Sequence, residues 1–355
     1  MQLDAVLAQR LATQGLTRPY DTVEDAVRSL LCVQSQDAPL ARWSLAMRTG
    51  RTHDDDVSAA VDSGRVVRTH VLRPTWHYVH AADLRWLLAL TSPKVVSALA
   101  ARHRQLGLDD AAVVGREHRW LADTLRGGRH LTRRQLTRDD LRGERLGHLV
   151  MLAELDGLVC SGPLVGGQHT YALVDEWIPA TPDKERDEAV RELVLRFFAG
   201  HGPASVAHLV RWTTLTKREV TAAVADLGEA LESAEVESQT LVWAAGTRDV
   251  GVSAGTRLVP VFDEAHLTYP GSTFPRVPDH PWGDRAHAFS EAGGGLVVSD
   301  LRDVGWWKRR EDGRTTRVTV GLAPSLGAAA RRQVEEQAAA LAAYTGRTLE
   351  LVLQT

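Results

Sequence analysis

Residues 65–79, RVVRTHVLRPTWHYV, decide the expected fold, because they follow helical patterns and themselves read as two strands. The runs at residues 65–69 and 75–79 are rich in β-branched and aromatic side chains, which is typical of strands. A short segment that contains Pro74 joins them and is expected to form the turn. The stretch therefore predicts a β-hairpin.

Three helices are expected before this hairpin. The sequence TVED at residues 22–25 has nearly the pattern of a capping box, and the apolar periodicity after it predicts a helix that ends near Gln34. Two further helices are expected at residues 39–48 and 54–63, and Gly64 ends the second of them. Helices followed by a two-stranded hairpin predict a winged helix.

The same order of patterns recurs twice along the chain, which predicts tandem winged-helix units. In the second unit, a helix-turn-helix pair is expected at residues 131–136 and 147–155, with strands at residues 157–161 and 169–173. In the third unit, helices are expected at residues 187–199, up to Trp212 and after the capping sequence at residues 216–219, with strands at residues 231–236 and 239–244.

The remaining chain is expected to be rich in β-structure. Its predicted strands are residues 257–262, 295–299, 304–309 and 315–320, followed by an amphipathic helix over residues 325–344. We predict an α+β protein with winged-helix units over residues 1–118, 119–180 and 181–248 and a β-rich region over residues 249–355. This region is expected to pack on the third unit.

Composition excludes several classes of protein. The chain has 355 residues, of which 44% are hydrophobic, so it can bury a sizeable core. Cys32 and Cys160 have no metal-ligand spacing, and the 14 histidines form no such motif, so we expect no metal; no phosphate loop supports a nucleotide cofactor. No apolar run reaches the ~20 residues of a membrane span, and we expect a cytoplasmic protein. The net charge of -3 means that nucleic-acid binding would depend on local clusters of arginine.

Gln34 and Gln36 lie one residue apart where the first helix is expected to end. Amide side chains at a helix end can satisfy free backbone carbonyls, in which case the pair is a cap without chemistry. Asp37 has a better structural role, because it precedes a helix with Pro39 in its first turn. The glutamines lack so clear a role and are therefore also candidates for a functional site.

The first hairpin is dense in cationic and aromatic side chains. Alternation along the strands places Arg68, His70 and Arg73 on accessible positions. We expect these three side chains and His77 to contact DNA, through phosphates or by stacking on bases. The alternative is a solvated strand edge, whose charges discourage pairing with another strand.

A second cluster follows in GWWKRREDGRTTR, residues 305–317, where Asp312-Gly313 predicts a hairpin turn. We expect this hairpin to lie in a DNA groove, with contacts from Trp307, Lys308, Arg309, Arg310, Arg314 and Arg317. The alternative is that Trp306 packs into the core while the cations are solvated. Asp263 and Glu264 form the one acidic pair that invites a catalytic role, and pairing with an arginine is the more frequent role for such residues.

Nine short segments, in order over nearly the whole chain, resemble the AlkZ/YcaQ family of bacterial winged-helix DNA glycosylases. They are QRL at residues 9–11, VQSQD at 33–37, RT at 48–49, the hairpin at 65–79, DLRW at 83–86, DGLVCSGP at 156–163, GHGPA at 200–204, LVPVFDE at 258–264 and GWWKR at 305–309. The resemblance implies tandem winged helices in a C-shaped arrangement around double-stranded DNA. It also implies excision of N7-alkylated purines, including guanines in interstrand crosslinks.

The family's catalytic signature is glutamine, an apolar residue, then glutamine or aspartate. Gln34 and Gln36 resemble the branch with two glutamines, which implies that they are catalytic and that the protein serves DNA repair or self-resistance to a DNA-alkylating natural product. Ser35 stands where the family has an apolar residue. The implied partner is double-stranded DNA with alkylated guanine or a crosslink, and we expect a monomer without a cofactor.

Two neutral amides are adequate for such a substrate. Alkylation at N7 makes the base cationic, so it departs without a general acid, and the site has only to place a water and stabilise an oxocarbenium-like state. Two alternatives stay open. The first is a non-catalytic DNA-binding regulator, in which the glutamines are caps, and the second is a protein that confers resistance by sequestering an alkylating drug.

Overall fold

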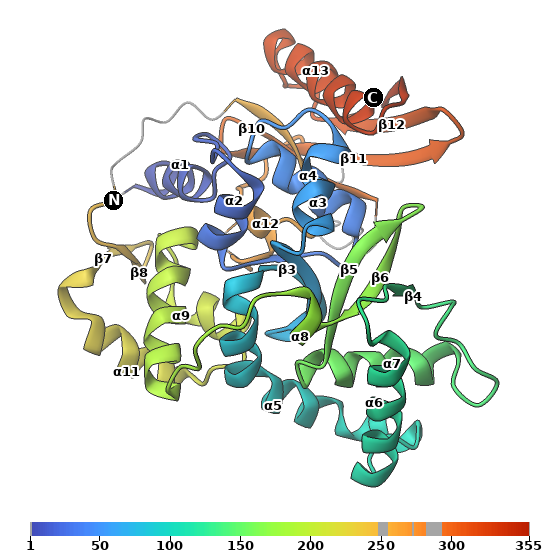
Figure 1. Ribbon diagram of the computed structural model, residues 1–355. Coiled ribbons are helices and arrows are strands. Elements are labelled where there is room, and N and C mark those ends of the chain that lie inside the picture. Colours follow the sequence, from blue (N-terminus) through green and yellow to red (C-terminus); the bar gives the residue numbers. More distant parts are fainter. Residues whose placement is uncertain (1, 248–254, 272, 282–292, 355) are drawn as a thin grey trace.

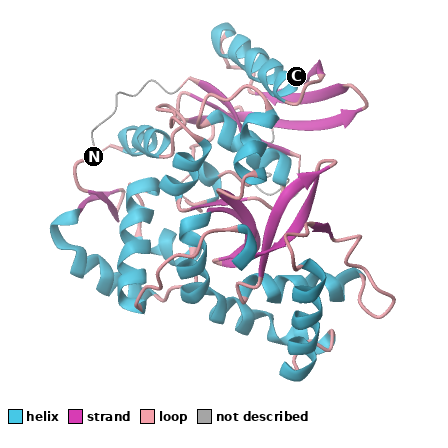
Figure 2. Ribbon diagram, viewed as in Figure 1, coloured by secondary structure: helices cyan, strands magenta, loops and turns pink. Residues whose placement is uncertain are grey.

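The structure, a computed structural model, describes residues 2–247, 255–271, 273–281 and 293–354. These residues form a mixed α/β molecule with four separate sheets (Figures 1 and 2). In Figure 1 the largest sheet and helix α13 (Ala328–Tyr344) lie at the top, and the remaining sheets lie below among helices. The expected α+β class is confirmed.

The first repeat has the order that the sequence predicts, with one added strand. After α1 (Leu3–Thr13), it consists of α2 (Val23–Leu30), β1 (Cys32–Gln34), α3 (Ala38–Met47), α4 (Asp54–Asp62), β2 (Val66–Val71) and β3 (Arg73–His80). The Thr22 side chain caps α2 by accepting a hydrogen bond from the Asp25 N–H at 3.0 Å. The sheet order is β1-β3-β2, so β1 and β2 pair on either side of β3.

The second repeat has the same sheet order, with one helix in place of two between its first and second strands. A long helix, α5 (Ala81–Gln105), leads to α6 (Ala111–Leu125), β4 (Leu131–Thr132), α7 (Gly143–Leu155), β5 (Val159–Val165), β6 (Gln168–Leu173) and the short α8 (Val174–Trp177), with sheet order β4-β6-β5. The helix expected at residues 131–136 is wrong. The Thr132 N–H donates to the Gln135 side chain at 2.8 Å. This local hydrogen bond competes with those of a helix, and the segment forms a strand and turns instead.

The third repeat consists of α9 (Arg186–His201), α10 (Val206–Trp212), α11 (Lys217–Leu227), the 3₁₀ turn Gly228–Ala230, β7 (Leu231–Val236) and β8 (Gln239–Ala244). The capping box expected before α11 is confirmed, because the Thr216 and Glu219 side chains accept from each other's backbone N–H. A single bridge between Ala204 and Val242 takes the place of the first strand. In all three repeats, helices thus precede a β-hairpin, as the sequence predicts; their assignment as winged helices stays a prediction.

The C-terminal sheet has the order β13-β12-β11-β10-β9. Its strands are β9 (Thr256–Pro260), β10 (Gly294–Ser299), β11 (Arg302–Asp312), β12 (Thr315–Leu322) and β13 (Thr348–Gln354), and α12 (Glu264–Leu267) and α13 accompany them. The last strand, which no sequence pattern predicts, pairs parallel with β12.

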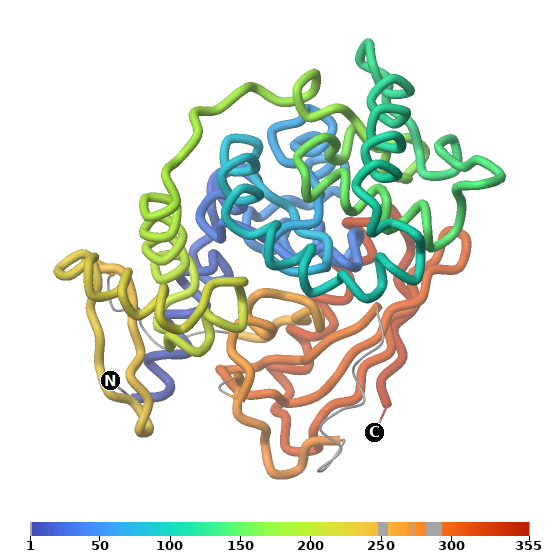
Figure 3. The backbone as a smooth tube through the Cα atoms, turned by 90° about the horizontal axis from the view of Figure 1, so that it is seen from below, coloured from blue at the N-terminus to red at the C-terminus, as the bar shows by residue number. Residues whose placement is uncertain are grey.

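The C-terminal sheet packs on the first repeat and not, as expected, on the third; the contacts with the third repeat come from Glu264 and Tyr269, which lie outside the sheet. One apolar cluster joins Val27 and Trp43 of the first repeat to Trp307, Val318 and other residues of the C-terminal sheet. The physical reason is that α3 lies against β9 and buries its apolar side chains in this cluster. In Figures 1 and 3 the second and third repeats lie on either side of the first.

The predicted bounds of the units and their C-shaped arrangement stay predictions. The boundary expected between residues 248 and 249 lies outside the described residues.

Candidate active site and DNA-binding surface

Gln34 lies at the end of a strand, so the predicted helix end is wrong. Helix α2 ends at Leu30, and Leu31 has a φ of 65°, which turns the chain into β1. Strand β1 pairs antiparallel with β3, with Gln34 opposite His77. The three residues of β1 are too few for apolar periodicity to distinguish them from a last helical turn.

The Gln34 side chain is 8% exposed and ends in an unsatisfied acceptor. Its Oε1 has no hydrogen-bond partner within the described part of the chain. The side chain lines a small cavity together with Asp37, Ser44 and Asp263. The cavity volume of about 10 Å³ is comparable with the ~10–15 Å³ that one water molecule requires. The cavity beside Gln34 is thus about the size of one water molecule.

The peptide after Gln34 is fixed on two sides. The Ser35 N–H donates to the Trp76 carbonyl at 2.7 Å, and the Ser35 carbonyl accepts two hydrogen bonds from the Arg68 guanidinium at 3.0 and 3.2 Å. Ser35 itself is fully buried, and its Oγ has no hydrogen-bond partner among the described residues. Gln36 is exposed. The two amides thus differ, one being buried at a cavity and one facing solvent.

Arg68 is engaged within the protein. Besides its bonds to Ser35, its guanidinium stacks over the Trp76 ring at 4.4 Å from the centroid, and its backbone N–H donates to Ser161 in the second repeat at 2.6 Å. Burial lowers the pKa of Arg68. The side chain that was predicted to contact DNA therefore holds the segment between the two glutamines.

The expected accessibility of His70 is wrong, and His77 is buried as well. His70 is 2% exposed and pairs with the Glu154 carboxylate, and His77 is fully buried. Burial, and then the neighbouring Arg73, hold the pKa of His77 well below its usual value, so its ring is neutral. Its Nδ1 donates to the Thr75 carbonyl at 2.9 Å. Neither histidine can contact DNA in this conformation.

These histidines are buried because other elements cover the first hairpin. Helix α5 packs against both of its strands, β5 and α7 of the second repeat pack against β2, and β1 pairs along the edge of β3. Arg73, which is half-buried, lies 3.3 Å from the Nε2 of His77. Alternation along a strand identifies its two faces, but it cannot tell which face another part of the chain will cover.

Trp307 of the C-terminal hairpin is also buried, which corrects its predicted contact with DNA. It is fully buried, and its Nε1 donates to the Val259 carbonyl at 3.2 Å. The Arg309 side chain shares this inward face and is 9% exposed; its guanidinium lies 3.3 Å from the Glu311 carboxylate and 3.9 Å from that of Asp37. Arg309 therefore links the hairpin to the start of α3.

The outer face of this hairpin is basic and exposed. Lys308, Arg310, Arg314 and Arg317 are all exposed, as the sequence predicts. Arg310 and Arg317 lie directly opposite each other on β11 and β12. Like charges in that arrangement destabilise a sheet, and the Glu350 carboxylate at 3.0 Å from Arg317 offsets only part of the repulsion. This face suits an anionic partner.

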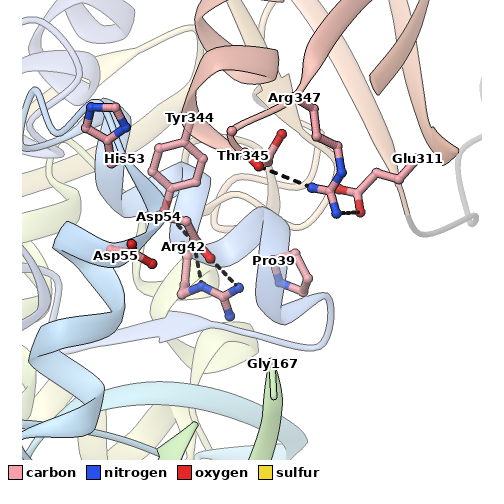
Figure 4. Close-up of a pocket in the computed structure, with 11 residues that line it drawn as sticks. Pro39, Arg42, His53, Asp54, Asp55, Gly167, Glu311, Tyr344, Thr345 and Arg347 are labelled. Carbon is pink, nitrogen blue, oxygen red and sulfur yellow. Dashed lines mark hydrogen bonds and ion pairs between the residues drawn. The ribbon is translucent and has the colours of Figure 1, made fainter. Parts of the chain in front are cut away.

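A cleft of about 460 Å³ lies beside this hairpin (Figure 4). It is lined by Arg42 and Asp54 of the first repeat, Gly167 at the tip of the β5–β6 hairpin, and Glu311 and Arg347 of the C-terminal region. The Arg42 guanidinium binds Asp54 at 2.7 and 2.9 Å, and the Tyr344 hydroxyl donates to the same carboxylate at 2.8 Å. No sequence signal indicates this cleft, because its residues come from five separate segments.

Asp263 forms a buried ion pair, as expected for the acidic pair. Its carboxylate accepts two hydrogen bonds at 2.7 Å from Arg48, and both side chains are fully buried. Burial alone would raise the pKa of Asp263, but the Arg48 guanidinium and the Ser44 hydroxyl hold it below its usual value. Its neighbour Glu264 contacts the Gln34 peptide, a contact that no sequence signal indicated.

Within the described ranges, no group of three histidine, cysteine or carboxylate side chains is arranged to hold a metal ion. Cys32 and Cys160 are buried and are not joined in a disulfide. Among the helices of the described residues, none has the length and hydropathy needed to span a membrane.

The family model described as "DNA glycosylase AlkZ-like" matches residues 27–344. The chain belongs to this family. A relative from Streptomyces sahachiroi, named "Interstrand DNA cross-link repair glycosylase", is 25% identical over an alignment of 336 residues that covers 85% of this chain and 86% of the relative. The solved structure of Streptomyces sahachiroi DNA glycosylase AlkZ matches 99% of this chain and 100% of its own with a TM-score of 0.76 at 22% identity, which shows a shared fold.

The resemblance based on nine short segments is thereby confirmed. As an AlkZ-like DNA glycosylase, the protein is a hydrolase of N-glycosyl bonds that acts on DNA in repair. The catalytic role of Gln34 and Gln36 and the DNA contacts of the exposed arginines stay predictions.

Proposed function

We propose that this AlkZ-like glycosylase excises purines alkylated at N7 and that Gln34 and Gln36 carry out the reaction. The observation that carries the proposal is the buried Oε1 of Gln34, an acceptor without a partner among the described residues. The carboxylates at the same cavity are engaged, Asp263 by Arg48 and Asp37 by the Leu40 N–H. An amide oxygen therefore remains to hold a water.

This arrangement suits a leaving group that is already charged. A neutral amide cannot accept a proton as a carboxylate does, so it is a poor general base. It can still orient a water and place the negative end of its dipole near a positively charged sugar. A purine alkylated at N7 needs no protonation to depart. The two glutamines then have only to orient the water and to stabilise the positively charged sugar.

The proposal is tested by single-turnover excision of 7-methylguanine from a DNA duplex. Gln34→Ala and Gln36→Ala are each expected to lower the rate by ~10²-fold, the usual effect of removing one preorganised polar group. Ser35→Ala is the matched control, because it changes the buried residue between the glutamines without removing a satisfied hydrogen bond. Its rate should stay within about twofold of the wild type. Unchanged rates in both glutamine variants would refute their role.

The same assay separates the enzyme from a regulator. A non-catalytic DNA-binding protein would protect a specific DNA sequence without producing abasic sites. A protein that sequesters an alkylating drug would bind the free agent and leave 7-methylguanine in the duplex. Abasic sites that depend on Gln34 and Gln36 are expected only from the glycosylase.

We further propose that the outer face of the β11–β12 hairpin contacts the DNA backbone. Four exposed cations lie on it or at its turn, namely Lys308, Arg310, Arg314 and Arg317. The adjacent cleft leaves space between this hairpin and the tip of the β5–β6 hairpin. We no longer assign DNA contacts to Arg68 and Arg73, because the protein itself engages their guanidinium groups.

Removing two of these cations is expected to weaken binding in a salt-dependent way. Each phosphate contact contributes ~0.9 to the slope of log affinity against log salt, so Arg310→Ala with Arg314→Ala should reduce the slope by up to ~1.8. The measurement is fluorescence anisotropy of a labelled duplex between about 50 and 200 mM salt. Arg191→Ala, which removes an exposed arginine on α9, is the control. Equal slopes for the double variant and the control would exclude the hairpin as a DNA contact.

Interstrand crosslinks belong to the same substrate class. A crosslinked guanine is tethered to the opposite strand and cannot be rotated into a deep pocket, so its excision requires a site at an open surface. The exposed Gln36 beside the buried Gln34 supports such a site. We propose that crosslinked guanines are substrates and that the protein serves repair or self-resistance to a DNA-alkylating natural product.

A further inference from the structure

Glu264 is a buried carboxylate whose two oxygens bind three different parts of the chain. It is fully buried at the start of α12. Its Oε1 accepts the backbone N–H of Gln34 at 3.0 Å. Its Oε2 accepts from the Trp212 indole N–H and from the Thr268 hydroxyl, both at 3.0 Å. The carboxylate therefore joins the first repeat, the third repeat and the C-terminal region.

Glu264 also differs from its neighbour Asp263 in having no cationic partner. Asp263 is paired with Arg48, whereas no ion pair to Glu264 is found in the ranges that the structure describes. A buried charge without an ion pair is costly, and neutral hydrogen-bond donors offset only part of that cost.

The contact with Gln34 completes the immobilisation of the proposed catalytic peptide. The next residue, Ser35, is held by Trp76 through its N–H and by Arg68 through its carbonyl. Glu264 holds the preceding N–H, so the backbone is fixed on both sides of the Gln34 side chain. The direction of that side chain, which belongs to a residue that lines the cavity, is then set by its own rotamer alone.

We propose that Glu264 is a positioning residue for Gln34 and that Trp212 of the third repeat fixes the orientation of its carboxylate. This inference rests on the proposed function for the reaction that Gln34 serves. The contact itself is a property of the fold, and it is testable without any activity. Misplacement of a catalytic group by about 1 Å costs up to ~10²-fold in rate, so loss of this anchor has a measurable effect.

The informative variant is Glu264→Gln. An amide has one acceptor oxygen and one donor nitrogen, but the Gln34 N–H and the Trp212 N–H are both donors. One of them must face the amide nitrogen. Trp212→Phe removes the competing donor and keeps an aromatic ring, so the double variant can turn its oxygen to Gln34 and its nitrogen to the Thr268 hydroxyl. The double variant is therefore the rescue of the single one.

The expected single-turnover rates on 7-methylguanine DNA follow from this geometry. Glu264→Gln should lower the rate roughly tenfold with DNA affinity unchanged within about twofold, and Glu264→Gln with Trp212→Phe should recover most of it. In a Gln34→Ala background, Glu264→Gln should have no further effect, because it acts through Gln34. A merely structural residue would lower the rate in both backgrounds. An unchanged rate for Glu264→Gln in an active enzyme overturns the inference.

Amide hydrogen exchange tests the anchor independently of activity. The Gln34 N–H should exchange faster in Glu264→Gln than in the wild type and regain protection in the double variant, while the Ser35 N–H changes less. Equal protection of Gln34 in all variants would also overturn the inference. If the wild type does not excise 7-methylguanine but the exchange pattern holds, the proposed function fails and the anchor stands.

Discussion

A duplex with one 7-methylguanine should lose that base at least about 10²-fold faster than a matched duplex loses hypoxanthine. A general acid normally contributes ~10²–10⁴-fold by protonating the departing base, and neutral glutamines cannot act in this way. The cationic lesion does not need that contribution, whereas the neutral purine does. Single-turnover rates, with the lesion in the same sequence context and opposite the same base, measure the ratio.

The comparison requires a control for access to the base. Hypoxanthine is a purine of similar size, and the same duplex with uracil adds a smaller neutral base. DNA affinity for the three substrates should differ far less than the rates do. Rates within about tenfold of one another would show that the site supplies a proton. Asp37, the nearest residue to the glutamines in sequence with an ionisable group, would then be the acid to test by Asp37→Asn.

Local signals made most of the fold predictable. Thr22 and the Thr216–Glu219 pair mark helix starts, and Asp312-Gly313 marks a hairpin turn; each acts over a few residues and is confirmed. Strand β13 and the packing of the β-rich region on the first repeat were not predictable in this way. They depend on which apolar faces meet after folding, and several faces have similar patterns.

The site was predictable to a smaller extent, for a related reason. The residues of the Gln-Ser-Gln segment are local in sequence, and so the resemblance identified them. Their anchors are not local. Arg68 reaches the Ser35 carbonyl from the first hairpin, and Glu264 reaches the Gln34 N–H across 230 residues. No periodicity or motif spacing encodes such a contact.

The buried ion pair between Arg48 and Asp263 leads to the largest expected effect on stability. It joins the end of α3 to the loop after β9, and the Arg48 guanidinium also donates to Ser44 at 2.7 Å and to Gln14 at 3.1 Å. Arg48→Met leaves the Asp263 carboxylate buried without a cation. Removing one partner of a buried pair costs ~3–5 kcal/mol, so the free energy of unfolding in urea should fall by about that amount.

The matched control is Arg126, whose pair with Asp123 at 3.1 Å is more than two-thirds exposed on both sides. Arg126→Ala should cost less than ~1 kcal/mol, because solvent already screens that pair. The loss in Arg48→Met should also depend on pH. In the wild type the pKa of Asp263 is depressed, so its contribution to stability is present above the pKa of an unfolded aspartate, ~3.9, and is lost as the pH falls through the folded value.

In Arg48→Met the pH dependence of stability has the opposite sign, because burial raises the pKa of an aspartate that has lost its cation. The variant is then destabilised as the pH rises above the unfolded value, and its difference from the wild type should be larger at about pH 7 than at about pH 5. A difference in unfolding free energy that is small, or that does not change between these two pH values, would mean that the pair does not hold the first repeat to the C-terminal sheet. Asp263→Asn combined with Arg48→Met should recover part of the loss, because no carboxylate then remains buried without a partner.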